Sequence, residues 1–118
     1  MRFNNDSGNN YSWIISTDFG ASSATISTSA IPLDSATVAV GGSETSSFDI
    51  NNVATAEKLL DGINNRTAGG GAGTTPVRLA VSAKWANAAT QITRVDVINA
   101  GTGNYGTGSE VIVIGWDY

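Results

Sequence analysis

Apolar residues recur along the chain in short runs, separated by loops rich in Gly, Asn, Ser and Thr. The clearest run lies between residues 77 and 85, where apolar Val77, Leu79, Val81, Ala83 and Trp85 alternate with polar or small residues. Strict alternation predicts an antiparallel strand with one buried face. We predict further strands at residues 2–3, 11–15, 37–40, 46–50 and 92–98. Short strands with Gly- and Asn-rich turns between them predict an all-β, antiparallel sandwich.

Three segments give weaker or mixed patterns. Residues 25–31 are rich in Ser and Thr and fit either a weak strand or a surface loop. Residues 53–63 carry apolar side chains at helical spacing, with Asn52 as a candidate N-cap, but 59–64 also fit a strand that follows a turn. Of these two alternatives we favour the strand. Residues 67–75 contain the run AGGGAG and predict a loop that lacks the Gly-Lys-Ser/Thr ending of a phosphate-binding loop.

The last apolar run, residues 111–114, consists of Val, Ile, Val and Ile with no polar residue between them. A strand that is apolar on both faces needs both faces covered. We therefore expect these residues either to form a central strand or to be covered by a neighbouring subunit.

Composition indicates one folded domain over residues 1–118. A chain of this length can bury about two thirds of the surface that it exposes when unfolded, which is enough for one core. Only 14% of the residues are charged, and many Val, Ile and Thr are present, which argues against disorder. The net charge of −4 is small, so repulsion between copies of the chain is weak and close self-packing is favoured.

Several classes of function are disfavoured by composition. The six basic residues are scattered, so we expect no nucleic-acid partner. The chain has no Cys and no His, which excludes disulfides, thiolate metal sites and Ser-His catalysis. We expect no signal peptide, and no apolar run approaches the roughly 20 residues of a membrane span, so we expect no membrane partner. We predict a protein that is not an enzyme.

The polar clusters predict no metal or cofactor site. The Asn-rich stretch 4–9 was weighed as a Ca²⁺ site, but it holds one carboxylate and lacks the Asp-x-Asp-x-Asp-Gly spacing, so a turn is the better interpretation. Carboxylates at 49, 61, 96 and 110 were weighed as a glycosidase pair. Nothing in the sequence brings two of them together, so we interpret them as solvated surface groups.

Aromatic and β-branched residues on strands are the best candidates for a subunit interface, since such side chains usually serve as core or interface anchors. The candidate interface residues are Tyr11, Trp13, Trp85, Ile112, Ile114, Trp116 and Tyr118. A platform of Trp and Tyr rings that stacks on sugars is the alternative use of the aromatics, so a glycan partner stays open.

The order of motifs resembles a broad family of small tailed-phage virion proteins that also occurs in proviral contexts. The motifs are RFNNDSGNNY at 2–11, Phe-Asp-Ile at 48–50, Lys-Trp at 84–85, Thr-Gln-Ile-Thr-Arg-Val at 90–95, and Gly-Ser followed by an apolar strand ending in Gly at 108–115. The likeness covers nearly the whole chain, and the ordered set is more specific than any single motif. Longer members of the family carry strands before the first motif, so this chain is predicted to lack an edge strand that a neighbouring subunit supplies.

The resemblance implies a virion location and a non-enzymatic structural role, as a capsid decoration (cement) or tail-associated subunit with a jelly-roll-like fold. We expect a homo-oligomer, a trimer or a higher assembly, in contact with other virion proteins through β-sheet and aromatic contacts. Two alternatives stay open: a carbohydrate-binding module at a fibre tip, and a self-polymerising filament or surface-layer subunit.

Overall fold

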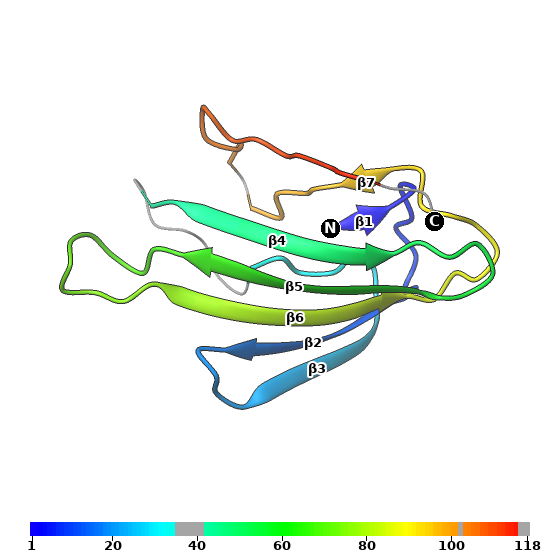
Figure 1. Cartoon of the computed structure of the whole chain (residues 1–118), viewed down its shortest axis with the longest axis horizontal. Coiled ribbons are helices and arrows are strands. Elements are labelled where there is room, and N and C mark those ends of the chain that lie inside the picture. The colour runs from blue at the N-terminus through cyan, green and yellow to red at the C-terminus, as the bar shows by residue number, and fades with distance from the viewer. Residues whose placement is uncertain (35–41, 102, 116–118) are drawn as a thin grey trace.

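The computed structural model describes residues 1–34, 42–101 and 103–115, and within these ranges every element is a β-strand. The strands are β1 (Arg2–Phe3), β2 (Tyr11–Thr17), β3 (Ser22–Thr28), β4 (Glu44–Asn51), β5 (Lys58–Arg66), β6 (Val77–Trp85) and β7 (Val95–Asp96). They form two antiparallel sheets that pack together (Figure 1). The all-β sandwich predicted from the sequence is therefore confirmed.

The larger sheet has five strands in the order β3-β2-β6-β5-β4. Strands β4, β5 and β6 form a meander, and the β2–β3 hairpin joins it because β2 pairs with β6 from Tyr11↔Trp85 to Thr17↔Leu79. The smaller sheet contains only β1 and β7, with Arg2 opposite Asp96. This second sheet is smaller than that of a jelly roll, which divides eight strands between two sheets.

The β2–β3 hairpin is closed by a tight turn and interrupted by a bulge. Asp18 and Phe19 have φ values of +48° and +62°, and Gly20 N–H donates to the carbonyl oxygen of Thr17 at 2.8 Å. Two consecutive positive φ values are the signature of a type I′ turn, whose twist matches that of the flanking strands. The register shifts between Tyr11 and Trp13, and the bulged stretch of β3 includes Ile26, which is 79% exposed.

The core lies between the inner face of the five-stranded sheet and the smaller sheet. Alternation along β6 places Leu79, Val81 and Trp85 inward, and each is at most 1% exposed. The buried apolar residues are Met1, Phe3, Tyr11, Ile15, Ile31, Leu60, Leu79, Val81, Ala83 and Trp85. Gly62 of β5 is required for close packing, because a Cβ atom there would lie 2.2 Å from the ring of Phe48.

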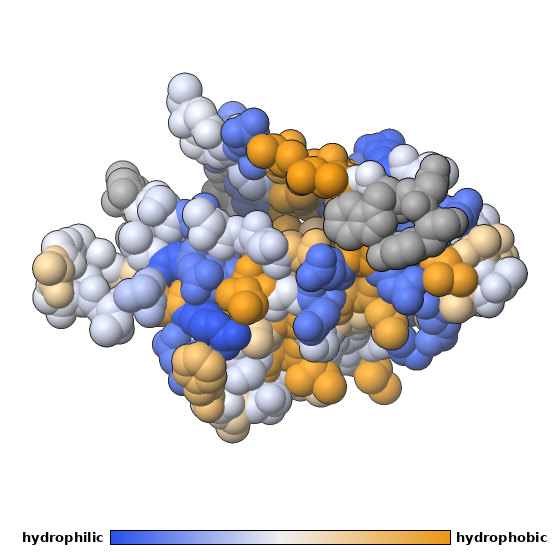
Figure 2. Space-filling view, viewed as in Figure 1, coloured by the Kyte–Doolittle hydropathy of each residue, from blue (hydrophilic) through white to orange (hydrophobic). Residues whose placement is uncertain are grey.

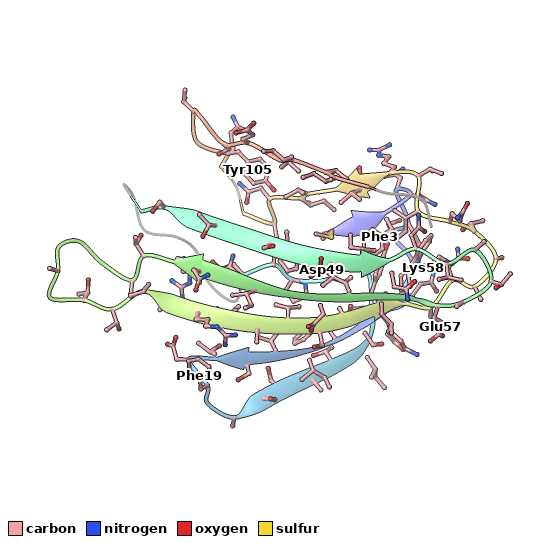
Figure 3. All side chains as sticks on the ribbon, in the orientation of Figure 1. Phe3, Phe19, Asp49, Glu57, Lys58 and Tyr105 are labelled. Atoms are coloured by element: carbon pink, nitrogen blue, oxygen red, sulfur yellow. The ribbon has the colours of Figure 1, made fainter. Side chains whose placement is uncertain are left out.

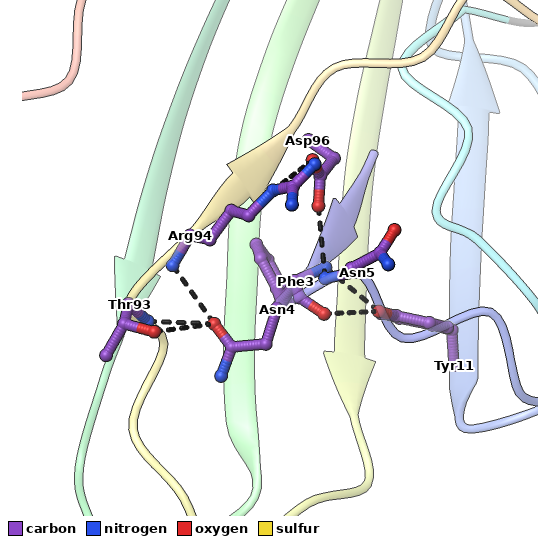
Figure 4. A network of polar contacts seen from close by, with 7 residues as sticks. All are labelled: Phe3, Asn4, Asn5, Tyr11, Thr93, Arg94 and Asp96. Atoms are coloured by element: carbon purple, nitrogen blue, oxygen red, sulfur yellow. Dashed lines mark hydrogen bonds and ion pairs between the residues drawn. The ribbon is translucent and has the colours of Figure 1, made fainter.

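In the N-terminal loop, the side chain of Asn4 binds the backbone segment that precedes β7 (Figure 4). Its Oδ1 accepts hydrogen bonds from the backbone N–H groups of Thr93 (2.9 Å) and Arg94 (3.0 Å). The backbone N–H of Asn5 donates to the Asp96 carboxylate at 3.1 Å. Asn4 and Asn5 both have positive φ, which Asn tolerates better than most residues. The turn predicted for this stretch is confirmed.

The structure resolves the mixed segments. Residues 58–66 form strand β5 and not a helix, so the turn-and-strand interpretation of 53–63 is confirmed. Residues 22–28 form β3, so the weak-strand interpretation of 25–31 is confirmed with shifted bounds. The strand predicted at 37–40 lies outside the described residues.

Two predicted strands need correction. The strand expected at 92–98 is reduced to Val95–Asp96, because the backbone before it is bonded to asparagine side chains. One of these is Asn52, whose Oδ1 accepts from Ile92 N–H at 2.6 Å and whose Nδ2 donates to Ile92 C=O at 3.0 Å. Residues 111–114 form no strand, and they lie at the surface and not at the centre of a sheet. A strand needs a hydrogen-bonded neighbour, and no sheet pairing within the described residues includes these four.

Lys58 joins two loops at one end of the sheet (Figure 3). The residue is 0% exposed, and its Nζ donates to the carbonyl oxygens of Ala56 (2.6 Å) and Asn87 (2.9 Å). These bonds tie the turn before β5 to the loop after β6.

We expect Lys58→Met to lower the free energy of unfolding by about 1–3 kcal/mol, because two carbonyl oxygens lose their donor. Urea denaturation followed by circular dichroism measures this. Lys84→Met is the matched control: Lys84 Nζ bonds Glu57 at 2.8 Å on a partly exposed surface, and such pairs contribute about 0–1 kcal/mol. Equal losses in the two variants would contradict a structural role for Lys58.

Candidate functional site

The outer face of the five-stranded sheet carries an open, apolar groove of about 490 Å³. Its lining comes from β3, β2, β6 and β5, which are adjacent strands. The large apolar side chains are Ile14, Ile26 and Leu59, which are 51%, 79% and 57% exposed. Asp61 and Lys84 are polar members of the lining. Trp13, one of the predicted interface residues, belongs to this lining. The prediction did not include Ile14 or Leu59, although both occupy outward positions of their strands.

A second apolar surface is the segment Val111–Ile114. Its four side chains are 65%, 71%, 72% and 76% exposed, in chain order. Four adjacent apolar residues at this exposure are unusual, since single exposed apolar residues are the norm on a soluble surface. Within the described part of the chain, no other residues bury this segment, although its apolar sequence predicts that both of its faces are covered.

These two surfaces lie on opposite sides of the molecule. In Figure 1 the segment runs above β7 at the top of the view, whereas β2 and β3 lie at the bottom. Figure 2 shows hydrophobic colour in both places. The exposed side chains of the groove face away from the core and from the smaller sheet, because Ile14 and Leu59 alternate with buried residues of the same strands.

The predicted interface residues fall into three groups. Tyr11 and Trp85 are each 1% exposed and belong to the core, so the prediction of them as subunit contacts needs correction. Their burial arises because both occupy inward positions at the paired ends of β2 and β6. Trp85 is equally unable to stack on a sugar. Trp13 is partly buried against the core, and Ile112 and Ile114 are exposed. Trp116 and Tyr118 lie outside the described residues.

Trp85, Tyr11 and Phe3 form a buried aromatic cluster, with ring centroids 5.8–6.4 Å apart. The Trp85 indole Nε1–H donates to the Asp6 carboxylate at 2.7 Å. Phe3 N–H donates to the hydroxyl oxygen of Tyr11 at 2.9 Å. Burial raises the pKa of the Tyr11 hydroxyl above its usual range. This cluster is a structural connection between the N-terminal loop and the five-stranded sheet, since every polar group named here has a partner within the chain.

The polar stretch 4–9 has the same structural role. Asp6 Oδ1 accepts from Gly8 N–H at 2.9 Å, and Oδ2 accepts from Asn10 Nδ2 at 2.9 Å as well as from the Trp85 indole. The hydrogen bonds from Asn10 and Trp85, in that order, lower the pKa of Asp6 below its usual range. Within the described residues no three acidic side chains gather at one place.

One carboxylate pair does come together. Asp49 of β4 is directly opposite Asp61 of β5 on the outer face, and Asp61 accepts a hydrogen bond from Ser82 Oγ at 2.6 Å. Like charges opposite each other destabilise an antiparallel pair. The sequence analysis found no such pair, because the β4–β5 register that creates it depends on the turn between the strands.

Comparisons of the chain with protein-family models, with curated proteins and with solved structures gave no match. None of the described residues belongs to a helix of the length and hydrophobicity needed to cross a bilayer. The features that bear on function are therefore the two apolar surfaces and the order of motifs in the sequence.

The Asp6–Trp85 bond predicts an acid-sensitive contact. The pKa of Asp6 is lower in the folded state than in the unfolded state. The ionised Asp6 carboxylate therefore stabilises the fold fully above the unfolded-state pKa of about 4, and this stabilisation is lost as the pH falls through the folded-state pKa. We expect the Trp85 Nε1–H resonance in ¹H–¹⁵N spectra to titrate below pH 4, with Trp85→Phe to assign it.

Asp6→Asn is the control for this titration, since it removes the ionisable group. The Trp85 Nε1–H resonance of that variant is expected to be independent of pH over the same range. A wild-type resonance that titrates at or above pH 4 would contradict the assignment.

Proposed function

We propose that this chain is a non-enzymatic structural subunit of a virion, a capsid decoration or tail-associated protein that assembles with copies of itself. The observation that carries the proposal is the exposed apolar segment Val111–Ile114 on a chain of low charge. The order of motifs along the sequence supports the virion location. The all-β fold supports a structural role, because its edges and faces can be extended by further chains.

The energetics favour a repeated contact. Full burial of a Val or Ile side chain contributes about 1.5–3 kcal/mol. Because the four residues are 65–76% exposed, they together contribute at most roughly 6–12 kcal/mol. Association itself costs about 4–15 kcal/mol. A single contact of this kind is therefore weak, whereas many copies on a shell or ring add avidity. This balance fits a decoration or tail subunit, which acts at high local concentration.

Other features of the chain support a role without catalysis. It has no His and no Cys, and the buried polar groups around Asp6 and Tyr11 bind other groups of the same chain. The groove is open and mainly apolar in its lining. Such a surface is suited to packing against another protein surface, in the manner of an interface core.

We expect the purified protein to form oligomers at micromolar concentration, and Ile112→Asp combined with Ile114→Asp to shift it to the monomer. The reason is the cost of burying an unpaired carboxylate in an apolar contact. Sedimentation-velocity centrifugation gives the distribution of species, and negative-stain images show whether the assembly closes or grows into fibres.

The matched control places the same two charges in the adjacent polar stretch, as Thr107→Asp with Ser109→Asp. These residues are exposed and lie next to the segment, so the net charge is equal and the apolar side chains stay intact. We expect this control to assemble as the wild type does. A wild-type protein that stays monomeric at all concentrations would overturn the proposal.

A further inference from the structure

We infer that Val111–Ile114 of one copy binds in the outer-face groove of a second copy, the groove that contains Ile14, Ile26 and Leu59. This inference rests on the proposed self-association and names the surface that receives the segment. Both surfaces are apolar, and both are exposed within the described part of one chain.

The dimensions of the two surfaces agree. An extended segment of four residues is about 13 Å long, and four adjacent strands span about 14 Å from the first to the last. The groove crosses four strands, β3, β2, β6 and β5. The segment is therefore long enough to contact Ile26 at one side of the groove and Leu59 at the other.

Charge also agrees at one end. Glu110 precedes the segment directly, and the lining of the groove holds both Lys84 and Asp61, so Glu110 is favoured at the Lys84 position and disfavoured at the Asp61 position. Opposite charges at the end of an apolar contact contribute to orientation more than to affinity. Lys84 already bonds Glu57 at 2.8 Å, so an approaching Glu110 joins an existing pair.

The two surfaces do not meet within one chain, so in this proposal the segment comes from a second copy. The groove faces away from the smaller sheet, whereas the segment runs along the side of the molecule opposite β2 and β3 (Figure 1). The high exposure of Ile26 and Ile112 shows that neither covers the other within one chain. The contact joins two different surfaces, so it is heterologous and produces either a closed ring or an open fibre.

Site-directed cross-linking tests the inference directly, because the sequence contains no cysteine. One chain carries Ile112→Cys, and a second, ¹⁵N-labelled chain carries Leu59→Cys; both positions are exposed, so folding is preserved. The mixture is oxidised and the disulfide-linked heterodimer is counted by mass spectrometry. Ile26→Cys is a second partner position in the groove.

The matched control is Ser47→Cys, an exposed residue of β4 on the same sheet face but outside the groove lining. We expect the Ile112→Cys chain to link to Leu59→Cys or Ile26→Cys at least about tenfold faster than to Ser47→Cys, because docking raises the effective concentration of the thiols. Equal rates, with oligomers still present by sedimentation velocity, would overturn the groove assignment and leave self-association intact. Equal rates with monomers alone would overturn the proposed function as well.

Discussion

The hydrogen bond from the Trp85 indole to the Asp6 carboxylate joins residues 79 positions apart and fixes the N-terminal loop against the five-stranded sheet. Trp85 ends the central strand β6, and Asp6 lies in the loop that follows β1. The rings of Tyr11 and Phe3 pack against the same indole. This contact supports the smaller sheet together with the hydrogen bonds of Phe3 and Asn4, which matter because β1 and β7 each contain only two residues.

In this protein, side-chain amides form some of the backbone hydrogen bonds that strands of a second sheet would otherwise form. The side chains of Asn4 and Asn52 accept hydrogen bonds from the backbone between Ile92 and Arg94. In a longer strand, a neighbouring strand would accept these bonds. Local bonds of this type compete with sheet formation. These bonds pair the backbone N–H groups with few residues, but they do not form a broad apolar layer as a full strand would. The consequence is a sandwich with one full sheet and one small sheet, in which Val111–Ile114 stays exposed.

This incomplete architecture connects the fold to the proposed role. A subunit whose apolar surfaces were all satisfied internally would have no strong reason to assemble. Here the exposed surfaces are at opposite sides, and the chain carries few charges to oppose contact between copies. The bulge in the edge strand β3 disturbs simple edge-to-edge pairing. Contact between the apolar segment of one copy and the groove of another is the geometry that we propose for assembly.

The sequence by itself determined the strands whose pattern is local. Alternation fixed β6 from Val77 to Trp85, and the asparagines of the N-terminal stretch indicated their turn, because side-chain direction and turn chemistry depend on near neighbours. Only the tertiary structure decided the burial of Tyr11 and Trp85, the pairing of Asp49 with Asp61, and the exposure of residues 111–114. Each of these depends on register and on contacts between distant segments, which an apolar pattern in one segment does not specify.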